Sequence, residues 1–157
     1  MAVRYDDRAW SGGLRWRQSP EDFVFTVNAP LGQGALQIKG DSDAVHFKSA
    51  DGRELQADDL PDMIRHELGF DLPVIELRNW IRGLPATPGG AYLKRNAENR
   101  IEAIKQREWR IDYGIYQEFS GRWLPRKIHI SDGRYDIRIA VYDWLDESGQ
   151  NKESVNP

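Results

Sequence analysis

Apolar and polar residues alternate through the first third of the chain, with the period of two expected of a strand that has one dry face. The alternation runs through residues 10–17, 23–28, 36–39 and 45–47. Asp51-Gly52 then forms a strong signal for a two-residue hairpin turn. This part of the chain therefore predicts a meander of short antiparallel strands.

The period changes to that of a helix in the middle of the chain. Asp58 can cap one helical segment, and Gly69 and Gly83 are placed to end the first and the second segment. The apolar stripes are Leu60, Met63, Ile64 and Leu68 in the first segment and Val74, Leu77, Trp80 and Ile81 in the second. The sequence therefore predicts two short helices, each with an apolar stripe that must cover something.

Strand-like alternation resumes after Gly90. It covers residues 92–93, 101–104, 109–113, 128–130 and 137–141. Together with the first third, these segments make about nine to eleven short antiparallel strands in one strongly bent sheet.

A sheet with one apolar face must close on itself or be covered. We therefore predict a mostly β fold with short helices (α+β), in which the two helices plug or lid the open side of the sheet. The chain shows no internal repeat and no linker, so residues 1–145 are predicted to form one domain. Residues 146–157 are polar and are expected to be a flexible tail.

Composition narrows the class of protein. The 157 residues are 39% hydrophobic and 30% charged, which is typical of a folded, soluble chain. The absence of cysteine excludes disulfides, thiolate metal ligands and cysteine nucleophiles. A formal net charge of -3 argues against binding to nucleic-acid phosphates. The dispersed aromatic residues, six Trp, six Tyr and five Phe, fit either a packed core or an apolar cavity.

The sequence contains no recognisable catalytic or metal-binding pattern. His46, His66 and His129 lie in different predicted elements, and His46 and His129 fall at outward-facing strand positions. No histidine spacing typical of a metal site, no nucleophile motif and no nucleotide-binding loop is present. We therefore expect no catalytic residue, no metal and no cofactor, and this favours a binding protein.

One leucine occupies an unusual place. Residues 28–34, "NAPLGQG", have the composition of a turn, yet Leu31 lies at its tip, where side chains usually face water. Pro30 stiffens such a tip and Gly32 permits a tight reversal. A role for Leu31 outside the core would explain its position.

Five segments resemble the LolB family, the outer-membrane lipoprotein receptors of Gram-negative bacteria. They are "NAPLGQGALQI" (28–38), "ADDLPDMI" (57–64), "LRNWIRGLP" (77–85), "RIEAIKQREWRIDYGIY" (100–116) and "LPRKIHISDGRYDIRIAVYDW" (124–144). The resemblance covers about residues 10–145, and the ordered set of segments is more specific than any one of them.

The resemblance implies an unclosed antiparallel β-barrel, or half-barrel, with helices across its opening. It implies a receptor that takes lipoproteins from a periplasmic carrier and places them in the outer membrane, with the receptor itself lipid-anchored at the periplasmic face. It requires no cofactor and no nucleic acid, and we expect a monomer. Because Met1–Trp10 shows no signal core or lipidated cysteine, we expect this chain to be a trimmed, soluble form without the anchor.

The resemblance also implies roles for the turn residues and the apolar residues described above. Pro30, Leu31 and Gly32 would form a loop that probes the membrane. Inward-facing apolar residues of the strands and helices would line a cavity for acyl chains, although side chains that only pack on one another follow the same pattern. These candidates are Leu14, Trp16, Phe23, Phe25, Val27, Leu36, Ile38, Met63, Ile64, Val74, Leu77, Trp80 and Ile81.

Two other functions remain open at this stage. A soluble carrier of fatty acids or other small apolar ligands would have a similar cavity but no need for an exposed leucine at Leu31. An enzyme on the same scaffold would need polar groups that converge inside it, and only Tyr92, Tyr113 and Tyr116 are suggestive. Tyrosine hydroxyls more often bond to a sheet rim or to water.

Overall fold

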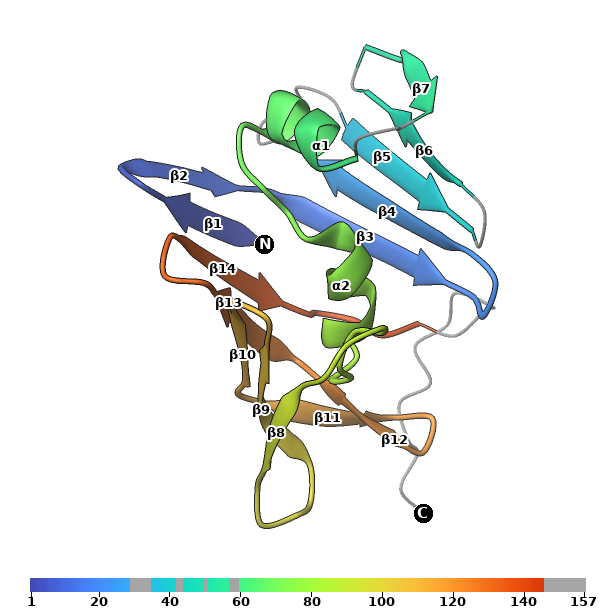
Figure 1. Ribbon diagram of the computed structural model, residues 1–157. Helices are drawn as coiled ribbons and strands as arrows, with labels where there is room; N and C mark the ends of the chain where they lie inside the picture. The colour runs from blue at the N-terminus through green and yellow to red at the C-terminus, as the bar shows by residue number, and fades with distance from the viewer. Residues whose placement is uncertain (29–34, 42–43, 50, 57–59, 146–157) are drawn as a thin grey trace. The chain divides into compact units, whose positions relative to one another are not determined.

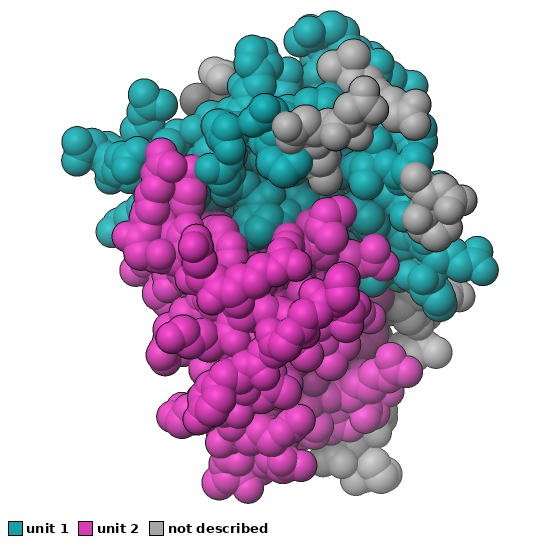
Figure 2. All heavy atoms as spheres, in the orientation of Figure 1, with its two compact units in different colours: residues 1–74 teal, residues 75–157 magenta. Residues whose placement is uncertain are grey.

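The computed structural model describes residues 1–157 except 29–34, 42–43, 50, 57–59 and 146–157. Its described part consists mainly of β-strands, with two short α-helices between the seventh and eighth strand (Figure 1). The chain divides into two compact units, Met1–Val74 and Ile75–Pro157, which Figure 2 shows in teal and magenta.

The first unit begins with a hairpin. Strands β1 (Ala2–Tyr5) and β2 (Arg8–Ser11) pair in antiparallel fashion, with Val3 opposite Trp10. The phenylalanine that follows the first helix, Phe70, packs on this hairpin, with its ring centroid 5.7 Å from that of Tyr5 and 5.5 Å from that of Trp10.

A five-stranded antiparallel meander makes up most of the first unit, in the order β3-β4-β5-β6-β7. Its strands are β3 (Gly13–Gln18), β4 (Phe23–Asn28), β5 (Ala35–Gly40), β6 (Val45–Lys48) and β7 (Glu54–Gln56). Edge strands β3 and β7 lie at opposite ends of this order, so the sheet is open. Helix α1 (Leu60–Leu68) follows the meander. An ion pair joins the two, with Oε1 of Glu67 on α1 lying 3.7 Å from Nη2 of Arg53, just before β7.

The second unit contains most of helix α2 (Val74–Trp80) and an antiparallel sheet with the local order β14-β13-β10-β9-β8. The strands are β8 (Tyr92–Arg95), β9 (Ile101–Gln106), β10 (Trp109–Tyr113), β13 (Lys127–Ser131) and β14 (Tyr135–Ala140). Strands β11 (Tyr116–Phe119) and β12 (Arg122–Pro125) form a separate hairpin.

A row of isoleucines crosses the sheet of the second unit. Ile111 pairs with Ile104 on one side and with Ile130 on the other, and Ile130 pairs with Ile137. All four side chains are buried. Directly opposed residues of antiparallel strands point to the same face, so this row forms the dry face of the sheet.

These observations confirm the predicted fold class: a mostly β protein with two short helices and antiparallel sheets that do not close on themselves. The single domain predicted over residues 1–145 stays a prediction, and the predicted tail, 146–157, lies outside the described residues.

The predicted number of strands was too low, since the structure has 14 strands in its described part. The segment 10–17 is divided between β2 and β3 at Gly12, where a Cβ would lie 2.3 Å from the backbone oxygen of Asn28 and 2.4 Å from the ring of Trp10. Only glycine allows so close an approach.

The hairpin β11–β12 was not predicted. Its turn is Ser120-Gly121, with φ angles of 48° and 75°. Two successive positive φ angles are typical of the tight turns that match the twist of a hairpin. The two strands could not be identified from the sequence, because Gln117 and Glu118 interrupt the alternation of apolar and polar residues that predicts a strand.

Candidate functional site

The seven strand residues predicted to line a cavity lie on one face of the meander in the first unit. Trp16 opposes Phe25, which opposes Ile38, and Leu14 opposes Val27, which opposes Leu36. Phe23 lies on the same strand as Phe25 and Val27, two residues before Phe25, and so shares this face. Leu14 and Trp16 are half-buried, and the other five side chains are buried. We call this set the aromatic face.

The rings of the aromatic face contact one another directly. Trp16 stacks on Phe23, with ring centroids 5.9 Å apart and an interplanar angle of 12°. It also meets Phe25 edge to face at 5.0 Å. The indole Nε1 of Trp16 donates to Gln18 Oε1 at 3.2 Å, so its polar atom is satisfied at the half-buried edge strand.

Two residues of this face were absent from the predicted site. Phe47 opposes Ile38 and is fully buried, and Gly40 opposes Phe23. A Cβ on Gly40 would lie 2.4 Å from Cε1 of Phe23, so glycine is what makes room for this ring. The alternation through residues 45–47 already placed Phe47 with the apolar set, whereas only the register places Gly40 under Phe23.

The predicted helical residues divide between the two units. Met63 is half-buried and Ile64 is buried on α1, and Val74 is the last residue of the first unit. Three residues belong to the second unit, and all are buried: Leu77, Trp80 and Ile81. The structure therefore brings together the strand residues as one face, while the thirteen candidates as a single cavity stay a prediction.

Helix α2 is held on the sheet of the second unit by buried hydrogen bonds. Gln106, 2% exposed, accepts at Oε1 from Trp80 Nε1 at 3.0 Å and from the backbone N–H of Ala86 at 2.8 Å. Its Nε2 donates to the carbonyl of Ala86 at 2.7 Å. Tyr113 adds a hydrogen bond from its hydroxyl to the carbonyl of Trp80 at 2.7 Å. We call this arrangement the glutamine clamp.

The three tyrosines considered for catalysis do not converge. Tyr113 and Tyr116 donate to the backbone carbonyls of Trp80 and Ile101, and Tyr92 is 72% exposed. Burial raises the pKa of Tyr113, and it raises the pKa of Tyr116 to about 12. Both hydroxyls thus stay protonated and bound to the sheet near neutral pH, which suits a structural role.

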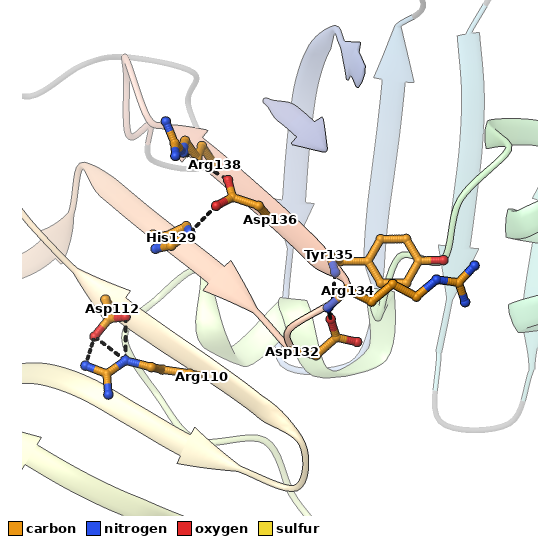
Figure 3. Close-up of polar contacts among 8 residues, drawn as sticks. All are labelled: Arg110, Asp112, His129, Asp132, Arg134, Tyr135, Asp136 and Arg138. Carbon is orange, nitrogen blue, oxygen red and sulfur yellow. Dashed lines mark hydrogen bonds and ion pairs between the residues drawn. The ribbon is translucent and has the colours of Figure 1, made fainter. Parts of the chain in front are cut away.

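The outer face of the second unit's sheet carries paired charges (Figure 3). Arg110 donates to both carboxylate oxygens of Asp112, at 2.7 and 2.8 Å. On β13 and β14, Asp136 accepts from Arg138 at 3.0 Å and lies 2.9 Å from His129. Burial alone would raise the pKa of Asp136, but the hydrogen bonds with His129 and Arg138 outweigh it and lower this pKa.

This pairing is typical of a solvated face. His129 is partly exposed there, and His46 on β6 is exposed, in agreement with the outward positions predicted for both. Among the described residues, no group of three or more His, Cys, Asp or Glu side chains is placed to hold a metal ion.

Pro30, Leu31 and Gly32 lie outside the described residues, so their predicted role in a loop stays a prediction. Within the part of the chain that the structure covers, no helix has both the length and the apolar character needed to cross a membrane.

An antiparallel sheet with one continuous apolar, aromatic face and few polar groups on it defines a β-sheet protein whose apolar face covers either a core or an apolar ligand. The comparisons with known proteins identify the family. The family model described as "Outer membrane lipoprotein LolB" matches residues 1–144, and the chain belongs to this family.

Curated relatives agree with the family model. The "Outer-membrane lipoprotein LolB" of Pseudomonas paraeruginosa (strain DSM 24068 / PA7) is 32% identical over 144 residues, which cover 92% of this chain and 70% of the relative. The protein of the same name from Stutzerimonas stutzeri (strain A1501) is 31% identical over the same shares of the two chains. Neither name states an enzymatic activity.

Proposed function

We propose that this protein receives the acyl chains of lipoproteins from a periplasmic carrier and transfers them to the outer membrane. The observation that carries the proposal is the family match over residues 1–144, together with relatives named as outer-membrane lipoproteins. The proposal includes a position at the periplasmic face of that membrane and activity as a monomer.

The physical difficulty of such a transfer is that exposing an acyl chain to water is unfavourable. Burial of one methylene group is favourable by about 0.8 kcal/mol, so the transfer of a sixteen-carbon acyl chain into water would cost roughly 12 kcal/mol. A receptor must offer a dry surface of similar length throughout the transfer. The aromatic face, with Leu14 and Trp16 half-buried at an edge strand, supports this role because it places apolar side chains where a chain could enter.

Release needs binding that is not too strong. Apolar contacts without directed hydrogen bonds hold a hydrocarbon tail in many positions, so the tail can slide and leave. A bilayer buries the chain more completely, and this provides the downhill step. Leu31 would touch the membrane at that moment, since one leucine is too little to anchor a protein when even a myristoyl chain binds only marginally.

The cavity is tested by two neighbouring substitutions on β3. Leu14→Gln places an amide on the aromatic face, whereas Arg15→Gln changes the exposed position beside it. We expect Leu14→Gln to lower the transfer of lipoprotein from a carrier to this protein, measured as the fraction of lipoprotein bound after mixing. Arg15→Gln should transfer normally. Equal behaviour of the two variants would remove the aromatic face from the proposal.

The membrane step is tested at Leu31. Leu31→Glu should leave lipoprotein binding intact but abolish delivery into liposomes, while Gln33→Glu adds the same charge to the same segment and should deliver normally. If Leu31→Glu delivers as well as the unchanged protein, the loop has no such role. Tight binding of free fatty acid with no uptake of lipoprotein would favour the fatty-acid carrier instead.

A further inference from the structure

Two pairs of arginines in the second unit differ in their partners. Arg110 and Arg138, on the outer face of the sheet, are each bound to an aspartate. Among the described residues, neither Arg82 nor Arg122 forms an ion pair with a carboxylate. In a chain with a formal net charge of -3, such a local excess of positive charge is a distinct feature.

Arg82 and Arg122 come from elements that touch. Arg82 lies in the turn after α2, and Arg122 is the first residue of β12. A Cβ placed on Gly83 would lie 3.2 Å from the hydroxyl of Tyr116 on β11 and 3.4 Å from Pro125 on β12. The turn after α2 is therefore packed directly against the hairpin β11–β12.

At this position, no carboxylate of the described residues neutralises the charge of Arg82, and one of its hydrogen-bond donors has no partner. Its Nη2 donates to Asn79 at 3.3 Å, but its Nε is buried and has no hydrogen-bond partner. Burial lowers the pKa of this guanidinium, and repulsion from Arg78 and Arg122 adds to the effect. An anion bound to the guanidinium groups at this point would relieve the repulsion between them.

An exposed aromatic residue lies on the same hairpin. Trp123 follows Arg122 on β12 and is 48% exposed. Because successive strand residues point to opposite faces, the two side chains lie on opposite faces of the hairpin, both close to its turn. The guanidinium of Arg100 lies 3.6 Å from the centre of its ring, a cation–π contact. Indole rings with one apolar side and one polar edge are enriched at the level of lipid head groups, where arginines also bind phosphate.

We propose that Arg82 and Arg122, with Arg78 and with the Trp123–Arg100 pair on the other face of the hairpin β11–β12, form a surface around this hairpin that binds the phosphate groups of membrane lipids. We call this surface the arginine patch. Guanidinium groups match phosphate with two parallel hydrogen bonds, and the half-exposed indole favours a bilayer over an acidic protein as the partner. The inference goes beyond the proposed acyl-chain transfer, and relies on it only for bringing the protein to a membrane.

The test measures vesicle binding alone, with neither lipoprotein nor carrier, so its failure is separate from a failure of the transfer assays. The protein, residues 1–157, is sedimented with phosphatidylcholine vesicles that contain or lack phosphatidylglycerol. We expect Arg82→Gln combined with Arg122→Gln to weaken binding to the phosphatidylglycerol vesicles about tenfold or more, because each cation near an anionic bilayer contributes to attraction.

The matched control is Arg110→Gln combined with Arg138→Gln, which removes the same charge from arginines that are already paired. In this control, binding to the phosphatidylglycerol vesicles should weaken by less than about twofold, because Asp112 and Asp136 already neutralise those two charges. Arg122→Gln alone, at an exposed position, tests the patch without any demand on folding and should still weaken binding. A Trp123→Phe variant should lose the blue shift of tryptophan emission that accompanies binding.

Three results would overturn the inference. An equal loss in both double variants would mean that only net charge matters. Displacement of the vesicles by inorganic phosphate at constant ionic strength would indicate a site for free phosphate. Binding of poly-glutamate through Arg82 and Arg122, with vesicle binding unaffected by the same substitutions, would indicate an acidic protein partner.

Discussion

The two units build their dry faces in different ways. In the first unit, a row of partners crosses the meander from Trp16 through Phe25 and Ile38 to Phe47, and aromatic rings fill the space. In the second unit, the corresponding row is made only of isoleucines, and the helix beside it is fastened by the glutamine clamp.

This difference concerns how freely each face can rearrange. Contacts between rings and aliphatic chains are numerous but not directional, so they can re-form in other arrangements at small cost. A buried hydrogen bond has a required geometry, and a donor or acceptor that loses its partner is strongly unfavourable. We infer that the apolar face of the first unit rearranges more easily than that of the second unit, where directional hydrogen bonds fix helix α2.

The largest loss of stability is expected when the glutamine clamp is removed. Gln106→Leu would leave three buried polar groups without partners, the Trp80 indole N–H and both backbone groups of Ala86. The free energy of unfolding, measured by urea denaturation, should fall by about 3–5 kcal/mol.

Gln37→Leu is the control for this substitution. Gln37 is half-buried and makes one long hydrogen bond, at 3.4 Å, to Thr26. Its replacement should change stability by less than about 0.5 kcal/mol. If Gln106→Leu were equally mild, apolar packing would hold both units and the contrast between them would disappear.

The second effect tests the packing of the aromatic face. Gly40→Ala places a methyl group against the buried ring of Phe23, and overpacking of this kind costs about 1–3 kcal/mol. Gly90→Ala is the matched change, since a Cβ there meets nothing within 4 Å, and it should be neutral. A neutral Gly40→Ala, by the same denaturation measurement, would show that the aromatic face rearranges even more easily than we infer.

A smaller effect is expected from a single hydroxyl of the second unit. Tyr116→Phe removes the hydrogen bond to the carbonyl of Ile101 and should cost about 1 kcal/mol at neutral pH. Because burial raises the pKa of Tyr116 from 10.0 to about 12, its contribution is complete below pH 10 and is lost as the pH rises toward 12. Unfolding measured from pH 9 upward should therefore show a shallower alkaline loss in the variant. An unchanged slope would contradict this assignment.

The smallest effect is expected on the outer face. Arg138→Gln breaks an exposed ion pair with Asp136, and its cost should stay below about 0.5 kcal/mol. A larger loss in thermal or chemical unfolding would show that the charged face of the second unit, and not only its clamp, stabilises that unit.

Local pattern predicted much of this protein. The alternation of residues 23–28 and 36–39 placed Phe25 and Ile38 on one dry face, and the register confirms that they are opposed. The apolar spacing of residues 60–68 and 74–81 predicted both helices, which the structure has at Leu60–Leu68 and Val74–Trp80. These features are encoded by neighbours in sequence, so a period is enough to find them.

Features that depend on distant partners were missed. Gln106 is an unremarkable polar residue at the end of a strand, and it becomes the centre of a clamp only because Trp80 and Ala86 are brought to it. The arginine patch was likewise hidden, because Arg82 and Arg122, 40 positions apart in sequence, are brought near one another only by the packing of the turn after α2 on the hairpin β11–β12.

The sequence by itself determined which side of the alternating strands is dry, that two short helices lie between the strand segments, and which family the chain resembles. The tertiary structure alone decided which rings touch, where glycine must make room, and which polar groups are buried with partners. The reason is physical: periodicity follows from the geometry of a single element, whereas close packing and the pairing of buried polar groups depend on atoms that only the folded chain brings within contact.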